Sequence, residues 1–295
     1  MELQVEDKPA GKRLSKFRRI VNAVPHVLTD RDMAIVAAVA EYRLLSRSQI
    51  QRLLGFGTAT RVNFRLQKLF HRGYLARHYL PTLKGSSQAI YGLDRLGLPV
   101  AAERLGKDTA DLWHPKALHP FFLAHQLAVN DVRIAFELAA RAHDHHQLLQ
   151  WLPEEEAYDR FFFGTSWRSL TPDAFLRYRV GKQVLAAFVE VDRGTMPNRR
   201  FKEKIERYFA YDVSGRYAER YKGQRFRVLV ITSSAERLAN LKNTAAQVAQ
   251  RNCWFATLSE IAQNGPLAAI WETVGGERKA RLIETDSKEV HGQAR

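Results

Sequence analysis

The chain has 295 residues, of which 45% are hydrophobic and 26% charged, and its formal net charge is +15. This length suggests two domains, and the basic excess indicates a polyanionic partner, nucleic acid before an anionic membrane. No apolar run approaches the ~18 residues of a membrane-spanning helix, and no apolar stretch of a secretory signal follows the basic N-terminus. The single cysteine, Cys253, cannot form an intramolecular disulfide. We therefore expect a cytoplasmic protein without a membrane partner.

Residues 1–24 are predicted to form a basic, flexible arm. Six lysines and arginines lie between Lys8 and Arg19, and no hydrophobic period accompanies them. Such an arm can lie along the phosphates of DNA. A tail that only keeps the protein in solution has the same composition.

Residues 25–97 are predicted to contain three helices followed by two strands. Thr29, Ser46 and Thr58 each stand before an apolar pattern of helical period, as helix-capping residues do. Residues 74–80 and 89–93 are strand-like runs separated by a polar loop. Three helices and a hairpin predict a winged helix-turn-helix domain, with the third helix in the recognition position.

The third helix and the hairpin carry the candidate contacts to double-stranded DNA. Arginine pairs with guanine and asparagine with adenine in the major groove, which suits Arg61, Asn63 and Arg65. The full set of candidate DNA-binding residues is Thr58, Thr60, Arg61, Asn63, Arg65, Lys68, Arg77 and Lys84. The alternative is a winged helix that contacts proteins, with these side chains solvated.

Residues 98–118 are predicted to be a linker, residues 119–272 an α/β domain, and residues 273–295 a polar tail. The α/β domain opens with a long helix, residues 121–143, whose apolar stripe is interrupted by His125, Asn130 and Arg133, to which we assign no role. Strand-like and helical patterns then alternate to residue 258. Such alternation predicts a mixed sheet with parallel neighbours, and the chain is α/β in this half and α+β overall.

A strand–turn–strand pattern around Gly181-Lys182 places three acids together. If Val180 pairs with Gln183, Asp173 lies opposite Glu190, and Asp192 shares their face because side chains alternate along a strand. Like charges placed so are destabilising. Mg²⁺ or Mn²⁺ would relieve the repulsion, as would a basic side chain such as Lys204 of the following helix. Alternatively, the strand ends at Glu190 and the acids are solvated.

The order Pro172-Asp173, Glu190-Val191-Asp192 and a basic helix resembles the PD-(D/E)XK nuclease superfamily. The resemblance implies a metal site of Asp173, Glu190 and Asp192, with these three acids and Lys204 as the catalytic residues. Asp192 stands where that motif has lysine, and some members supply the lysine from the next helix, here Lys204 or Lys202. An early acid among residues 154–156 is a further candidate ligand.

The longer pattern PDA…FVEVDRGT…KIERY, with the preceding helices, resembles the replication-relaxation family of plasmids and integrative elements over residues 29–258. It implies a DNA-binding protein in replication, relaxation, copy control or transfer, with replication or transfer proteins as partners and no demonstrated cleavage. Two alternatives stay open. One is an active Mg²⁺-dependent endonuclease or nickase, and the other is a transcriptional regulator or scaffold, including a homodimer, that uses the fold for protein contacts.

Overall fold

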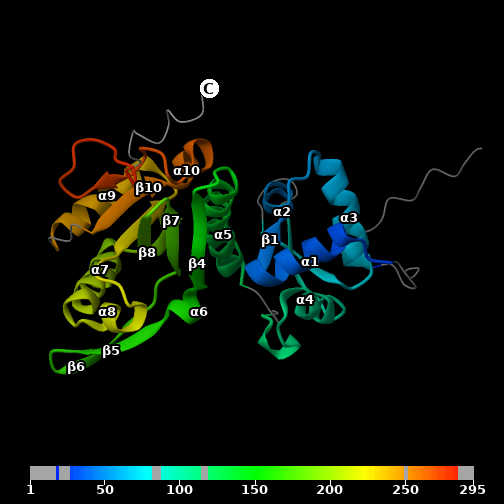
Figure 1. The fold of residues 1–295 in the computed structure, drawn as a ribbon, viewed down its shortest axis with the longest axis horizontal. Helices are drawn as coiled ribbons and strands as arrows, with labels where there is room; N and C mark the ends of the chain where they lie inside the picture. Colours follow the sequence, from blue (N-terminus) through cyan, green and yellow to red (C-terminus); the bar gives the residue numbers. More distant parts are fainter. Residues whose placement is uncertain (1–17, 20–26, 82–87, 114–118, 249–251, 285–295) are drawn as a thin grey trace, which may run out of the picture. The chain divides into compact units, whose positions relative to one another are not determined.

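The computed structural model describes residues 18–19, 27–81, 88–113, 119–248 and 252–284. The chain divides into two compact units, Met1–Leu123 and Ala124–Arg295. Both combine helices with a sheet, as predicted (Figure 1). None of the helices in these described ranges is long and apolar enough to cross a membrane.

The first unit contains the three predicted helices and the predicted hairpin. Its elements are α1 (Asp30–Tyr42), β1 (Leu44–Ser46), α2 (Arg47–Leu53), α3 (Ala59–His71), β2 (Leu75–Tyr79), β3 (Ala89–Leu93), α4 (Gly97–Leu105) and a 3₁₀ turn, η1 (Thr109–Asp111). The short strand β1, which the sequence did not suggest, pairs with β3 and completes an antiparallel sheet of order β1-β3-β2. The described part of the predicted linker, residues 98–113, falls within this unit, where α4 packs against α1.

Side-chain caps fix where the first three helices begin. The Thr29 hydroxyl accepts from the backbone N–H of Asp32, whose carboxylate accepts in return from the Thr29 N–H. Ser46 and Gln49 repeat this capping box at α2, and Thr58 caps α3. The apolar stripes of the helices meet over the sheet in a core that includes Ile35, Val39, Ile50, Val62, Leu66 and Leu69.

The second unit is built on a six-stranded mixed sheet of order β11-β10-β9-β8-β7-β4. Its strands are β4 (His146–Pro153), β7 (Ala174–Val180), β8 (Gln183–Asp192), β9 (Arg227–Thr232), β10 (Cys253–Thr257) and β11 (Glu272–Thr273). The pairs β8–β9 and β9–β10 are parallel and the others antiparallel. This is the mixed sheet with parallel neighbours that the sequence predicts.

Helices cover both faces of this sheet. One face packs against α5 (Pro120–Arg141) and α10 (Leu258–Asn264), and the other packs against α7 (Asn198–Val213), α8 (Arg216–Tyr221) and α9 (Ala235–Ala246) (Figure 1). Strand residues alternate between the two cores, as Leu176 and Ala187 on the α5 side and Phe175 and Phe188 on the α7 side show. The buried thiol of Cys253 belongs to the second core, as a small hydrophobic side chain.

The β7–β8 hairpin has the predicted register. Val180 pairs with Gln183 and Ala174 with Val189, and Asp173, just before β7, donates its backbone N–H to the Val189 carbonyl at 3.1 Å. Gly181 begins the turn with a positive φ of 54°, which glycine adopts at no steric cost. The predicted pairing of Val180 with Gln183 is therefore confirmed, and the shared face of Asp173, Glu190 and Asp192 stays a prediction.

Three further segments complete the second unit. The one-turn helix α6 (Glu154–Ala157) follows β4, and β5 (Asp159–Phe163) and β6 (Ser166–Leu170) form a separate two-stranded sheet beside α7. Beyond residue 272, Leu282 and Ile283 are buried in the core on the α5 side. The packed part of the unit therefore extends past the predicted domain end.

Candidate functional site

The three acids of the β7–β8 hairpin lie at the carboxyl end of β8, where β9 runs parallel to it. Ligands of α/β sheets usually bind at this edge. Glu190 and Asp192 are buried, with 4% and 5% of their surface exposed. The alternative prediction, that the strand ends at Glu190 and the acids are solvated, is therefore wrong, because β8 continues to Asp192.

Asp173 is held by α5 and by the neighbouring strand. His125 Nε2 lies 3.1 Å from Asp173 Oδ1, and the backbone N–H of Val191 donates to Oδ2 at 2.7 Å. Burial alone would raise the pKa of Asp173, but the charge of Lys204, the His125 hydrogen bond and the Val191 N–H together lower it. Burial likewise opposes protonation of His125, and its bond to Asp173 still raises its pKa. The pair therefore favours an aspartate beside an imidazolium.

Glu190 is held by two side chains of α7. Lys204 Nζ donates to one carboxylate oxygen and the Tyr208 hydroxyl donates to the other. Burial and the charge of Asp173 nevertheless raise the pKa of Glu190 to about 7. Burial also disfavours the charged form of Lys204, but the charges of Glu190 and Asp173 outweigh it and raise the lysine pKa. Lys204 thus stays charged, and Glu190 is the carboxyl of the site that titrates near neutral pH.

Asp192 takes part in a third pairing, formed with α9. Arg237 Nε donates to Asp192 Oδ2, and the Gly194 N–H donates to Oδ1 at 2.9 Å. The same guanidinium binds Asn198 and the Met196 carbonyl, so it fastens the β8–α7 loop to α9. This pairing turns the Asp192 carboxylate towards α9, whereas Glu190 is bound by α7.

Each acid of the hairpin therefore has a basic partner from a different helix: His125 of α5, Lys204 of α7 and Arg237 of α9. In the described ranges, no group of three or more His, Cys, Asp or Glu side chains is placed to hold a metal ion. The residues as arranged fit three acid–base pairs rather than a divalent-metal site. The predicted Mg²⁺ or Mn²⁺ remains a prediction.

Of the acids at residues 154–156, Glu154 lies near enough to interact with this site. Its pKa is raised, first by desolvation and then by the charge of Asp173, while Lys204 and His125 act in the opposite direction. It is the first residue of α6, which directly follows β4. Glu154 is thus the early acid that the site could recruit.

The residues predicted to bind DNA are distributed unevenly over α3. Thr58, Thr60, Arg61 and Asn63 are exposed, while Val62 and Leu66 of the same helix are fully buried. Thr58 also caps the helix by accepting from the Arg61 N–H. These four residues form an open polar surface at the N-terminal half of α3.

The other predicted DNA-binding residues have partners within the first unit. Arg65 donates to Asp32 and Thr29 of α1, each at 2.9 Å, and Asp32 is only 1% exposed. Lys68 lies over the ring of Phe64, and Arg77 lies over Phe70 and Tyr91. Lys84 is outside the described residues, as is most of the basic arm. Of that arm, Arg18 and Arg19 are described, and Arg19 ion-pairs with Asp94.

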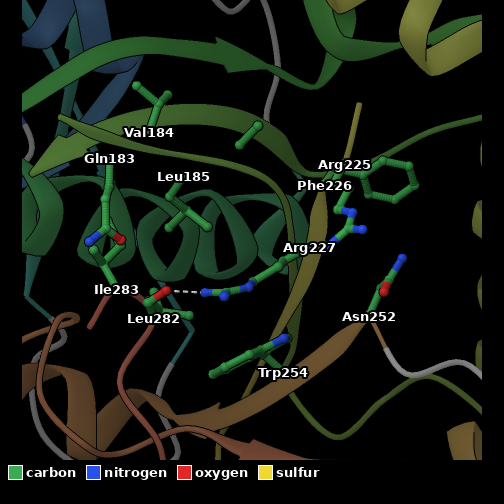
Figure 2. Close-up of a pocket in the computed structure, with 11 residues that line it drawn as sticks. Gln183, Val184, Leu185, Arg225, Phe226, Arg227, Asn252, Trp254, Leu282 and Ile283 are labelled. Carbon is green, nitrogen blue, oxygen red and sulfur yellow. Dashed lines mark hydrogen bonds between the residues drawn. The ribbon is translucent and has the colours of Figure 1, made fainter. Parts of the chain in front are cut away.

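A separate hollow of about 370 Å³ lies at the opposite end of the large sheet, near the starts of β8, β9 and β10. Figure 2 shows Arg227 crossing Trp254, with its guanidinium directed at the Leu282 carbonyl, to which it donates. Gln183 donates to the Glu284 carbonyl. These hydrogen bonds hold residues 282–284 against the sheet, and the residues that line the hollow do not include any of the acid site.

Three members of the site are not predicted from the sequence. His125 interrupts an apolar stripe, which is a signal, but pairing it with Asp173 requires the tertiary arrangement of α5 and β7. The helical pattern assigns Tyr208 only to packing against the sheet. Arg237, three residues after the Ser234 cap of α9, gives no signal, because its partner lies 45 residues away.

The fold and site are those of a two-unit α/β protein with a buried acid–base cluster at the edge of a mixed sheet. The sequence profile described as replication-relaxation matches residues 36–227. This match covers most of the chain, and the protein belongs to the replication-relaxation family. The family suggests a role in the replication or relaxation of a plasmid or other mobile element. No curated protein and no solved structure matches the chain.

Proposed function

We propose that the protein binds double-stranded DNA through the first unit, as part of the replication, relaxation, copy control or transfer of a mobile element. The observation that carries this proposal is the exposed surface of Thr60, Arg61 and Asn63 on a helix whose opposite side is buried. The order α1-β1-α2-α3-β2-β3, with a hairpin after the third helix, supports a winged helix with α3 in the recognition position. The net charge of +15 supports a polyanionic partner.

A gel-shift titration against duplex DNA tests this proposal. We expect affinity to fall with salt, log K decreasing by about 0.9 per bound phosphate for each unit of log salt. If Arg61 and Asn63 each read a base, Arg61→Ala with Asn63→Ala should cost about 1–3 kcal/mol per base read. The matched control is Arg104→Ala, which removes an equal charge from an exposed position of α4. Equal losses of affinity in the two variants, or binding that ignores salt, would refute the assignment of α3.

We further propose that the second unit is a nuclease-like domain. The order α5-β4-β7-β8-α7-β9 of the main sheet and its helices, and the position of Asp173 just before β7 with Glu190 on the neighbouring antiparallel strand β8, support it. A second candidate function, DNA cleavage, is favoured by one observation: Lys204 reaches Glu190 from the following helix, as expected where Asp192 replaces the motif lysine. For a metal to act here, Asp173 and Glu190 would have to exchange their basic partners for the cation.

Melting curves and a nicking assay on supercoiled plasmid separate these candidates. A divalent metal that binds the folded state at a hundredfold excess over its dissociation constant stabilises it by about 2.7 kcal/mol. Because each acid already has a basic partner, we expect Mg²⁺ or Mn²⁺ to leave the melting temperature unchanged and the plasmid intact. A metal-dependent rise that Asp173→Asn abolishes, together with nicking that EDTA stops, would instead establish the cleavage function.

A further inference from the structure

The β5–β6 hairpin presents two faces of opposite character. Its strands pair Asp159 with Leu170 and Phe162 with Trp167, so alternate residues point in opposite directions. Asp159, Phe161 and Leu170 are buried on the side that faces α7. Arg160, Phe162 and Trp167 point away from it and are exposed.

The outward face carries two large aromatic rings in solvent. Phe162 and Trp167 are 55% and 64% exposed, and their ring centroids lie 5.8 Å apart in an edge-to-face arrangement. The Arg160 guanidinium lies 5.5 Å from the Trp167 ring centroid. Adjacent exposed aromatic side chains mark interaction sites more often than single ones do. Both rings therefore present apolar surface to solvent, and Arg160 lies over one of them.

The charges around these rings select the kind of partner. The acid of the two strands, Asp159, is buried and bound by Arg216 and Arg220. Arg160 is therefore the charge on the outward face, while Arg168, paired with Phe161, lies on the other face over the ring of Phe163. A hollow of about 380 Å³ between Trp167 and α7 is lined by Arg168 of the hairpin and by Glu203, Glu206 and Arg207 of α7, so its charges balance. Glu203 pairs with Arg199. A cation next to exposed aromatic rings is an arrangement that binds unpaired nucleotides, since bases stack on the rings and a phosphate can pair with Arg160.

The hairpin is firmly held where it meets the rest of the unit. The Tyr211 hydroxyl donates to Asp159 at 2.7 Å, the Phe161 and Tyr211 rings are 5.0 Å apart, and Arg216 binds both Asp159 oxygens. Tyr211 belongs to α7, the helix that also carries Lys204. Figure 1 shows the hairpin at the margin of the second unit, next to α7 and α8. A fixed platform of this kind orders its rings before a ligand arrives, which lowers the entropic cost of binding.

We propose that the outward face of the β5–β6 hairpin, formed by Arg160, Phe162 and Trp167, binds single-stranded DNA by base stacking. This site is additional to the duplex-binding surface of α3 and does not depend on it. It would hold the unpaired strand that opens when a duplex is melted or relaxed. Because every base has a flat face, we expect little sequence preference.

Fluorescence anisotropy of labelled oligothymidylate, measured with the full-length chain, tests the proposal. Phe162→Ala and Trp167→Ala should each weaken binding about fivefold or more, because base–aromatic stacking contributes about 1–3 kcal/mol per base. Trp167→Phe keeps a ring and should retain most of the affinity. Phe209→Ala is the matched control, since Phe209 is 50% exposed on α7 outside the hairpin. Melting curves should show all four variants folded, because each change is at an exposed position.

Several outcomes would overturn the proposal. The first is that the double variant Phe162→Ala/Trp167→Ala binds oligothymidylate as tightly as the wild type, or no more weakly than Phe209→Ala. The second is that the double variant loses affinity for duplex DNA and for oligothymidylate by the same factor, which would indicate that the face binds duplex DNA. A change of oligomeric state on size exclusion with unaltered DNA binding would make the face a protein interface. Arg61→Ala/Asn63→Ala should weaken duplex binding and leave oligothymidylate binding intact, so failure of one proposal is distinguishable from failure of the other.

Discussion

The polar surface of α3 and the acid–base site of the second unit use charged side chains in opposite ways. Arg61 and Asn63 are exposed, so a ligand can reach them without rearranging the protein. Glu190 and Asp192 are buried, and each is neutralised by a neighbouring helix. Exposed polar groups contribute little to folding and are available for recognition, whereas a buried charge depends on its partner. Substitutions of charged and polar residues should therefore change ligand binding on α3 and change the stability of the fold at the acid–base site.

The substitution expected to have the largest effect on stability is Lys204→Ala. It leaves Glu190 buried beside Asp173 without its cation, and removing one partner of a buried ion pair costs about 3–5 kcal/mol. Urea unfolding followed by circular dichroism measures the loss of stability at pH 8, where Glu190 is ionised. Lys202→Ala on the same helix is the control and should change stability by less than about 0.5 kcal/mol. Equal effects in both variants would show that Lys204 does not neutralise the site.

The pH dependence of stability is the next largest effect. The pKa of Glu190 rises from 4.5 to about 7 on folding, so its contribution is fully present below 4.5 and lost as the pH rises through 7. His125, with a raised pKa, acts in the same direction, while Asp173, with a lowered pKa, loses its contribution only as the pH falls below 3.8. We expect the free energy of unfolding to fall by up to about 3 kcal/mol between pH 5 and 8.

Glu190→Gln identifies the group responsible for that slope. The amide cannot ionise, so this variant should lose the Glu190 part of the slope and keep only the contributions of the other titrating groups, among them His125 and Glu154. Urea unfolding of both proteins across this pH range provides the comparison. A slope unchanged from that of the wild type would contradict the assignment to Glu190.

Arg65→Ala tests whether α3 itself contains both kinds of side chain, those that stabilise the fold and those that are free to bind a ligand. Arg65 donates to buried Asp32 of α1, so its removal takes a charged donor away from a buried carboxylate that Thr29 also binds. Leaving a buried polar group short of a partner costs about 1–3 kcal/mol. Thermal unfolding should show a clear loss of stability. Unchanged stability would place Arg65 with the recognition residues instead.

Arg61→Ala and Asn63→Ala should have the smallest effect on stability. Both side chains are exposed, and surface substitutions away from caps and cores usually change stability by less than about 0.5 kcal/mol. The same thermal melts compare them directly with Arg65→Ala. A large loss of stability in either variant would mean that this half of α3 is structural, and the contrast between the two regions would disappear.

Much of the fold could be predicted from the sequence because its signals are local. Thr29, Ser46 and Thr58 mark helix starts, the apolar period marks the buried side of each helix, and Gly181 marks the turn of the hairpin in which Val180 pairs with Gln183. Caps, periodicity and tight turns act over a few residues, so they can be recognised before the chain is folded. The strand β1 was not predicted because three residues show no period.

Only the tertiary structure decided what neutralises each acid. His125, Lys204 and Arg237 come from helices that lie 48, 14 and 45 residues along the chain from their partners. The sequence contains many other lysines and arginines, and their spacing does not distinguish those that reach the hairpin. It also could not show that Arg65 binds Asp32 while Arg61 remains exposed. The pairing of each acid with its basic side chain depends on how the helices pack on the sheet. That packing is determined by the whole core rather than by residues close in sequence.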